Sequence, residues 1–237
     1  MKKFSKRHHI LVFTALVVFI FFLFINPINR KSTNLMLITS LILLWIYTLF
    51  LSRKSKTVKF VLILFPAILF FFLSLNGPTI DKETIRAEYV RALKKYEGTR
   101  YLWGGESSLG IDCSGLVRRG LIDTYIRLGI VNFSPQYIRK GLNLWFNDLS
   151  AEALGNGYKN QTILILANQT LNTLDYGEMK EGDIMVTANG IHTMAYIGNH
   201  EWIQADPKEG KVIILKAPNE NFWYNTPSNI LRWTDLE

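Results

Sequence analysis

The sequence predicts an α+β domain over residues 79–237, preceded by a membrane region over residues 1–78 with three transmembrane α-helices. Three long apolar runs near the N-terminus, helical periodicity in the middle and short strand-like segments in the last third predict this architecture. Charge divides the chain at the same place. Residues 1–80 hold ten of the 27 Lys and Arg and none of the 19 Asp and Glu, so the net charge of +8 is +10 from this part and −2 from the rest. The chain is therefore not uniformly basic, and nucleic-acid binding is not expected.

The apolar runs occupy about residues 10–25, 35–51 and 60–75, and none contains a charged residue. Each is slightly shorter than the roughly 20 residues that cross a bilayer, but flanking residues can complete the span. A cleaved signal peptide is the alternative for the first run, although no small-residue cleavage site follows it. We therefore expect three membrane helices and a lipid bilayer as partner.

Basic residues flank these runs unevenly. Four precede the first run, two separate the first from the second, and four separate the second from the third: Lys2, Lys3, Lys6 and Arg7; Arg30 and Lys31; and Arg53, Lys54, Lys56 and Lys59. Loops rich in Lys and Arg stay in the cytoplasm. The pattern predicts a cytoplasmic N-terminus and, after three crossings, a C-terminal domain outside the cytoplasm.

Helical periodicity follows the membrane region. An amphipathic helix is predicted from about Asp81 to Glu97, where Gly98 ends it. A second helix begins after Asp112, a good N-cap, and its apolar spacing continues until Gly129.

Short strands follow in the last third of the chain. They are predicted at 183–188, 191–197, 201–205 and 211–216, with an Asn-Gly hairpin signal at 189–190 between the first two. An antiparallel meander is the natural interpretation of four strands joined by short turns.

The single cysteine, Cys113, lies between a Gly-rich loop, Tyr101–Gly105, and the predicted start of the second helix. Backbone N–H groups and the helix dipole at such a position stabilise a thiolate, so Cys113 is a candidate nucleophile. The alternative is a small buried hydrophobic residue.

A thiol nucleophile needs a base, and His192 is the candidate. His8 and His9 fall in the basic N-terminal tail and His200 in a turn, whereas His192 enters a strand. If the connection after it is centred on Gly198, Gln204 lies directly across from His192, and its amide oxygen can accept the ring N–H. Asp206, on the same strand face as Gln204, is the competitor for this third position.

Four motifs together resemble the NlpC-type cell-wall cysteine peptidases, which have a papain-like fold. They are Tyr-Leu-Trp-Gly-Gly at 101–105, Asp-Cys-Ser-Gly-Leu-Val at 112–117, Gly-Asp-Ile at 182–184, and His192 leading into Ala-Tyr-Ile-Gly-Asn at 195–199. The similarity covers roughly residues 85–217. It implies that Cys113 is the nucleophile, His192 the general base and later acid, and Gln204 the polar third residue.

The resemblance also implies that Tyr101 lies beside the thiol and helps to bind the developing oxyanion, although it could instead be a packing residue of its loop. Asp112, Ser114 and Trp103 are expected to shape the substrate groove. The 79 residues that separate nucleophile and base exceed the usual spacing and suggest an insertion at about 132–180, including a helix from Ser134 through residue 146. This segment could roof the cleft or be extra scaffold.

The expected activity is hydrolysis of amide bonds in peptidoglycan stem peptides through a Cys thioester, at the outer face of a bacterial cytoplasmic membrane. A thiol acyltransferase or amidase acting on lipids or proteins is one alternative, favoured by three membrane runs, and a non-catalytic wall-binding module is another. Neither a metal nor a nucleotide cofactor is expected, because no His/Cys cluster has ligand spacing and no Lys-Ser/Thr follows the Gly-Gly pair. The bond cleaved and the oligomeric state stay open.

Overall fold

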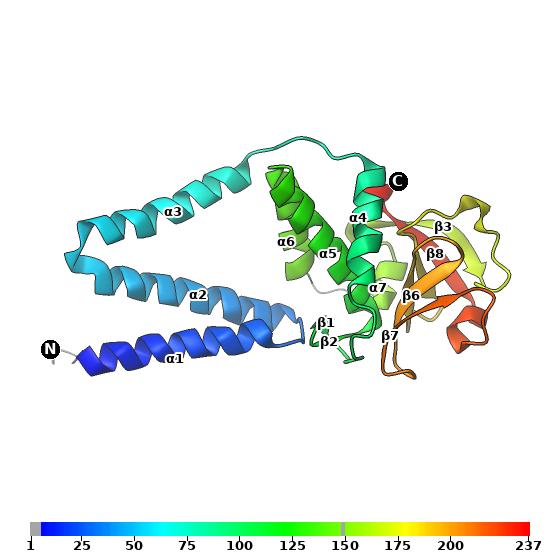
Figure 1. The fold of residues 1–237 in the computed structure, drawn as a ribbon, viewed down its shortest axis with the longest axis horizontal. Helices are drawn as coiled ribbons and strands as arrows, with labels where there is room; N and C mark the ends of the chain where they lie inside the picture. The colour runs from blue at the N-terminus through cyan, green and yellow to red at the C-terminus, as the bar shows by residue number, and fades with distance from the viewer. Residues whose placement is uncertain (1–5, 148–149) are drawn as a thin grey trace.

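A computed structural model describes residues 6–147 and 150–237. Three long helices, α1 (Lys6–Ile25), α2 (Lys31–Leu51) and α3 (Lys56–Ser74), extend away from a globular domain (Figure 1). All three are long and apolar enough to cross a membrane. Each begins about four residues before the apolar run that predicted it, because a flanking basic residue forms its first turn. The resulting 20, 21 and 19 residues supply the roughly 30 Å that a bilayer core requires.

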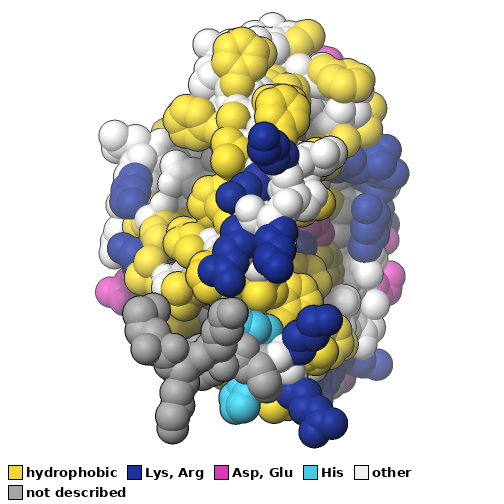
Figure 2. All heavy atoms as spheres, turned by 90° about the vertical axis from the view of Figure 1, so that its left-hand side faces the viewer, with side chains coloured by type: hydrophobic (Ala, Val, Ile, Leu, Met, Phe, Trp, Pro, Cys, Tyr) yellow, Lys and Arg dark blue, Asp and Glu magenta, His cyan; other side chains and the backbone are white. Residues whose placement is uncertain are grey.

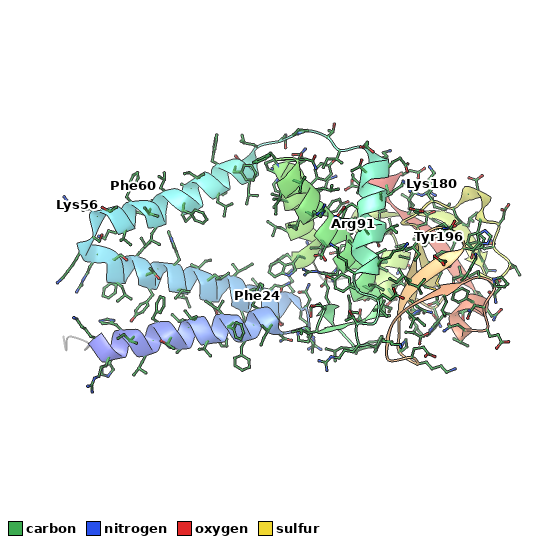
Figure 3. All side chains as sticks on the ribbon, viewed as in Figure 1. Phe24, Lys56, Phe60, Arg91, Lys180 and Tyr196 are labelled. Carbon is green, nitrogen blue, oxygen red and sulfur yellow. The ribbon has the colours of Figure 1, made fainter. Side chains whose placement is uncertain are left out.

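The ends of these helices differ in charge. The end farthest from the globular domain, which faces the viewer in Figure 2, gathers Lys and Arg side chains among hydrophobic ones. Lys56 marks this end in Figure 3, and Phe24 marks the opposite end of the helix pair, next to the globular domain. The predicted cytoplasmic residues Lys2 and Lys3 lie outside the described residues. The other basic residues of that prediction belong to the far end: Lys6, Arg7, Arg53, Lys54, Lys56 and Lys59.

Four helices belong to the globular domain: α4 (Lys82–Lys94), α5 (Cys113–Val131), α6 (Pro135–Phe146) and the short α7 (Ala151–Gly155). A capping carboxylate starts α4, since Asp81 Oδ1 accepts a hydrogen bond of 2.8 Å from the N–H of Thr84. The prediction that Gly129 ends the second of these helices is wrong, because α5 continues for two more residues. Gly129 instead allows α6 to pack closely: a Cβ there would lie 2.6 Å from Ile138 Cγ1.

The sheet has six antiparallel strands in the order β3-β8-β4-β5-β6-β7. Their bounds are Thr162–Gln169 (β3), Ile184–Thr187 (β4), Thr193–Tyr196 (β5), Glu201–Asp206 (β6), Lys211–Lys216 (β7) and Ser228–Trp233 (β8). The meander β4-β5-β6-β7 agrees with the predicted strands. The sequence did not predict β8, which inserts between β3 and β4.

Short elements complete the fold. A two-stranded ribbon, β1 (Glu106–Ser107) and β2 (Gly110–Ile111), precedes α5. Single turns of 3-10 helix occur at Ser52–Lys54, Tyr158–Asn160, Tyr176–Glu178, Phe222–Asn225 and Thr234–Leu236.

The two faces of the sheet bury different clusters. Helices α4 and α5 cover one face, where Leu93 and Leu116 pack in one cluster with Ile203 of β6. The other face buries Met185 and Trp202 beneath the C-terminal segment. Alternate residues of each strand therefore reach opposite cores, as the two-residue period of a strand requires. The result is an α+β domain of helices packed on an antiparallel sheet, as predicted.

A buried ion pair ties β8 to the start of β4. The Arg232 guanidinium donates to both carboxylate oxygens of Asp183, with Nε–Oδ1 and Nη2–Oδ2 distances of 2.6 and 2.8 Å. Asp183 is fully buried and the Arg232 side chain is 5% exposed. A bidentate pair in this setting positions both strands.

Replacing Asp183 with Ala is expected to lower the free energy of unfolding by about 3 kcal/mol, because Arg232 loses its bidentate partner inside the domain. Denaturant unfolding of the full chain in detergent, followed by near-ultraviolet circular dichroism, measures this loss. Lys140→Ala removes the exposed ion pair to Asp235 and is the control, with an expected loss below about 1 kcal/mol. Equal losses in the two variants would contradict the role given to the buried pair.

Candidate active site

Asp112 connects the Gly-rich loop to the first turn of α5. Its Oδ1 accepts hydrogen bonds from the N–H of Gly115 at 2.6 Å and from the Ser114 hydroxyl at 3.0 Å, and its Oδ2 accepts from the N–H of Gly104 at 2.8 Å. One carboxylate thus caps the helix and holds the loop. This arrangement places Cys113 at the first helical position, as predicted.

Two glycines let the loop pass over the helix start. A Cβ on Gly115 would lie 2.1 Å from the carbonyl oxygen of Gly105, a distance no side chain tolerates. Gly104 has a φ of +73°, the left-handed region that favours glycine. The loop can therefore lie directly against the residues that flank the thiol.

The thiol of Cys113 lies against the backbone at the start of β5, next to His192. Its Sγ is 4.0 Å from the carbonyl oxygen of Ile191, and the backbone N–H of Thr193 donates a hydrogen bond to the sulfur. These two backbone groups belong to the residues on either side of His192. Cys113 and His192, 79 residues apart in the sequence, are thereby brought together by the packing of α5 on β5.

The imidazole of His192 is buried and held on two sides. Its Nε2 lies 2.7 Å from Oε1 of Gln204, and its ring stacks on Trp223 with a centroid separation of 4.1 Å and an interplanar angle of 16°. Because the amide oxygen only accepts hydrogen bonds, Nε2 carries the proton. This tautomer leaves the lone pair on Nδ1, the nitrogen that is available to take a proton from a thiol.

The strand register differs from the predicted one. The pairs Ala195–Ile203 and Tyr196–Trp202 centre the β5-β6 turn on Asn199 rather than on Gly198. The physical reason is a three-residue turn in which Gly198, Asn199 and His200 all have positive φ.

This shift moves the two polar residues of β6 relative to His192. Continuing the register places Asp206, not Gln204, opposite His192. Gln204 reaches the ring diagonally from the same strand face.

Asp206 acts on His192 through charge rather than through a hydrogen bond. Its Oδ1 accepts from the N–H of Lys208 at 2.7 Å and its Oδ2 from the Asn221 amide at 2.8 Å. Burial has the largest influence on the pKa of His192 and lowers it, whereas the Gln204 hydrogen bond raises it. The Asp206 charge also raises this pKa, to a smaller extent. Both residues considered for the third position therefore influence the imidazole, and Gln204 makes the direct contact.

Tyr101 is partly buried, and its hydroxyl is near enough to Cys113, Asp112 and Asp206 to be influenced by their charges. Burial raises the pKa of its hydroxyl, and the negative charges of Cys113, Asp112 and Asp206 raise it further. The influence of Cys113 on this pKa indicates that the phenol lies in the same region of the domain as the sulfur, although Tyr101 is not among the residues that line the cleft there. The hydroxyl stays protonated near neutral pH and is available as a hydrogen-bond donor there.

A cleft of about 400 Å³ opens at Cys113. The three residues predicted to shape the groove, Trp103, Asp112 and Ser114, all line it, and Trp103 is 74% exposed. His192 is buried and is not among the lining residues. Further lining residues come from three other segments. Ser150, Ala151 and Glu152 belong to α7 and the residue before it, Asn189, Gly190 and Ile191 to the β4-β5 turn, and Asn29 and Arg30 to the α1-α2 loop.

The sequence model of the NlpC/P60 family matches residues 98–232, more than half of the chain. The chain belongs to the NlpC/P60 family. The match includes the Gly-rich loop, Cys113, His192 and Gln204, and its C-terminal boundary falls in β8.

Two curated relatives match about half of the chain. The chain is 27% identical over 139 residues to "Murein DD-endopeptidase MepS/Murein LD-carboxypeptidase" of Escherichia coli (strain K12), which covers 57% of this chain and 58% of that protein. It is 25% identical over 132 residues to "Dipeptidyl-peptidase 6" of Lysinibacillus sphaericus, covering 51% and 46% respectively. The chain thus spans about half the length of the curated relatives it matches.

Solved structures with similar folds include the peptidoglycan hydrolase RipB of Mycobacterium tuberculosis and NlpC2 of Trichomonas vaginalis. The first is 21% identical with a TM-score of 0.39, covering 67% of this chain and 72% of that one. The second is 18% identical with a TM-score of 0.42, covering 65% and 49%.

Both members of the Cys-His pair are neutral near pH 7. Burial lowers the pKa of His192 to about 4, and burial together with the Asp112 charge raises the pKa of Cys113 to about 12. The expected effect of the N–H groups at the helix start is present, but it does not decide the ionisation of the thiol. Backbone N–H groups of Cys113, Ser114 and Thr193 do lower the thiol pKa, but burial and the capping carboxylate outweigh them.

The sequence analysis missed one contributor to the site and left the role of the 132–180 segment open. Trp223 covers the imidazole, and its only sequence signal is the aromatic triplet at 222–224. The 132–180 segment serves both suggested purposes, since the start of α7 lines the cleft while β3 extends the sheet at its edge. Glu152 of α7 is held in place by the β4-β5 turn, where a Cβ on Gly190 would lie 2.8 Å from the Glu152 Cβ.

Alkylation of Cys113 by iodoacetamide is expected to be slower at pH 7 than alkylation of free cysteine, and its rate should keep rising above pH 9. The reason is that the thiolate is the reactive form and burial raises the pKa of this thiol. Mass spectrometry of the full chain in detergent measures the rate, and each modified chain reports Cys113 because no other cysteine exists. A rate that reaches its plateau near pH 6 would instead indicate a thiolate-imidazolium pair.

Proposed function

We propose that the chain is a membrane-anchored cysteine peptidase that hydrolyses amide bonds in peptidoglycan stem peptides. One observation carries the proposal: the Cys113 sulfur lies between the backbone groups that flank His192, and Gln204 holds the imidazole in the tautomer with a free Nδ1. Family membership supports the hydrolase class, and the name of the Escherichia coli relative supports murein as substrate.

The reaction begins from a neutral pair. His192 Nδ1 takes the thiol proton as Cys113 Sγ attacks the carbonyl carbon of the scissile amide, forming a C–S bond. The carbonyl oxygen becomes an oxyanion, which the Tyr101 hydroxyl and the backbone N–H of Cys113 stabilise. Keeping both groups neutral until substrate arrives avoids holding an ion pair in a buried site.

Three proton transfers complete the cycle. The C–N bond breaks as His192 gives its proton to the leaving amine, which leaves an acyl thioester on Cys113. His192 then takes a proton from water as the water oxygen attacks the thioester carbonyl, and the C–S bond breaks. The sulfur recovers a proton from His192, and the product is a carboxylic acid.

Replacing Cys113 or His192 with Ala is expected to lower the rate of peptidoglycan digestion at least about a thousandfold, because each removes a partner in bond formation. Tyr101→Phe should cost roughly a hundredfold, the typical effect of losing one oxyanion donor. His200→Ala is the matched control and should keep the wild-type rate. His200 lies in the β5-β6 turn, where its ring stacks on that of Tyr176. The assay is digestion of purified peptidoglycan by the full chain in detergent, with mass spectrometry of the new termini.

The same assay separates the alternatives. Cell wall that stays intact with the wild-type chain, or full digestion by Cys113→Ala, would refute the peptidase. A fatty acyl adduct on Cys113 would identify an acyltransferase or amidase that acts at the bilayer. Wall binding without any cleavage would identify a non-catalytic module.

The membrane orientation is part of the proposal. The basic residues at the far end of the three helices support a cytoplasmic N-terminus and a globular domain at the outer face of a bacterial cytoplasmic membrane. In that orientation the active-site cleft faces the cell wall.

Two engineered cysteines test this orientation in a Cys113→Ser background. Glu220→Cys in the globular domain should react with a membrane-impermeant maleimide in intact spheroplasts, whereas Lys54→Cys between α2 and α3 should react only after lysis. Both native side chains are exposed, so differences in burial do not explain a difference in labelling. The reverse pattern would place the domain in the cytoplasm.

A further inference from the structure

The loop between α1 and α2 lies against the Gly-rich loop that precedes Cys113. Ile28 forms an antiparallel bridge with Gly105, the N–H of Glu106 donates to the carbonyl of Pro27 at 2.8 Å, and the N–H of Asn29 donates to the carbonyl of Gly104 at 3.2 Å. Figure 1 shows the ends of α1 and α2 meeting the domain beside β1 and β2. A piece of the membrane region therefore extends the backbone pairing of the active-site loop.

A buried polar network fixes this contact. The Asn29 amide donates to the Glu106 carboxylate and, at 3.2 Å, to the carbonyl of Trp145. Asn34 of α2, which is 4% exposed, donates to Asn29 Oδ1 at 2.6 Å and to the same Trp145 carbonyl at 3.1 Å. Glu106 is paired in turn with Arg118 of α5 at 3.1 Å. A buried network of hydrogen bonds and an ion pair favours one geometry for the loop.

The pinned loop supplies part of the cleft wall. Asn29 and Arg30 line the cleft together with Trp103, Cys113 and Ser114. Arg30 is the only cationic side chain among the described residues of this lining. It is exposed and makes no ion pair or side-chain hydrogen bond within residues 6–147 and 150–237. The guanidinium is thus available to a ligand in the cleft.

We propose that Arg30 binds a carboxylate of the substrate peptide and so determines which peptides place their scissile carbonyl at Cys113. This inference rests on the proposed peptidase function. Guanidinium and carboxylate groups form paired hydrogen bonds of fixed geometry, which both binds and orients the ligand. Peptidoglycan stem peptides carry free carboxylates, and amidation removes them. The membrane region is then part of the specificity machinery as well as an anchor.

The test is a cycle of two substrates and several variants of the full chain in detergent. The substrates are one stem peptide with free carboxylates and the same peptide amidated at those groups. Arg30→Gln should raise KM for the free acid about tenfold, as expected for one lost charged hydrogen bond. Amidation of the peptide should raise the KM of the wild-type enzyme by a similar factor. The effects of amidation and of Arg30→Gln on KM should not add, because both remove the same contact. Arg30→Lys should retain part of the binding.

Lys31→Gln is the matched control, because it removes the same charge one residue away. Lys31 Nζ lies 5.7 Å from the ring centroid of Phe146 and does not line the cleft. This variant should behave as wild type on both peptides. If Arg30→Gln and Lys31→Gln have equal effects, or if Arg30→Gln weakens both peptides equally, the assignment of Arg30 is overturned.

Binding to Cys113→Ala separates this inference from the peptidase proposal. Calorimetric titration of Cys113→Ala, with and without Arg30→Gln, should show a tenfold weaker affinity for the free acid only when Arg30 is replaced. If the wild-type chain cleaves neither peptide, the peptidase proposal fails while the titration still decides the role of Arg30. Absence of any difference in the titration overturns the Arg30 proposal even where cleavage is normal.

Discussion

The structure depends on the carboxylate of Asp112. It caps α5, and the same two oxygens hold the N–H groups of Gly104 and Gly115. This bridge joins the loop that carries Tyr101 to the first turn that carries Cys113. The bridge also has an electrostatic cost for the thiol, because a negative charge beside the sulfur opposes its ionisation.

Burial explains the chemistry of the pair. The imidazole of His192 is covered by Trp223 and held by Gln204, so its cationic form is disfavoured and its pKa falls to about 4. A neutral imidazole with its lone pair on Nδ1 is a competent acceptor for a thiol proton. The proposed catalysis therefore uses the approach of substrate, rather than a preformed ion pair, to start proton transfer.

The membrane region and the globular domain meet at two places. The α1-α2 loop pairs with the active-site loop, as Ile28 and Gly105 show. The linker after α3 is held by α6, where the Gln136 amide donates to the carbonyl of Gly77 at 2.8 Å and Arg139 donates to the carbonyl of Leu75 at 2.6 Å. Two separate attachments restrict the orientation of the cleft relative to the helix ends.

Local signals in the sequence were sufficient for much of this architecture. Apolar runs marked the three long helices, Asp112 marked the start of α5, and the Asn-Gly pair at 189–190 marked the β4-β5 turn, because each feature acts on neighbouring residues. The pairing of Cys113 with His192 was predicted as a hypothesis from residue types and family motifs. Strand β8 was missed, since its position between β3 and β4 depends on pairing with segments far away in the chain.

Only the tertiary structure decided the details of the site. The three-residue turn at 198–200 set the register that makes Gln204 reach His192 diagonally, and packing placed Trp223 on the ring. Burial, which no local pattern encodes, raises the pKa of Cys113 more than the backbone N–H groups at the helix start lower it. The position of Arg30 at the cleft likewise depends on contacts between the α1-α2 loop and the Gly-rich loop, which are more than 70 residues apart in the sequence. Sequence patterns describe neighbours along the chain, whereas pKa values and cleft walls depend on neighbours in space.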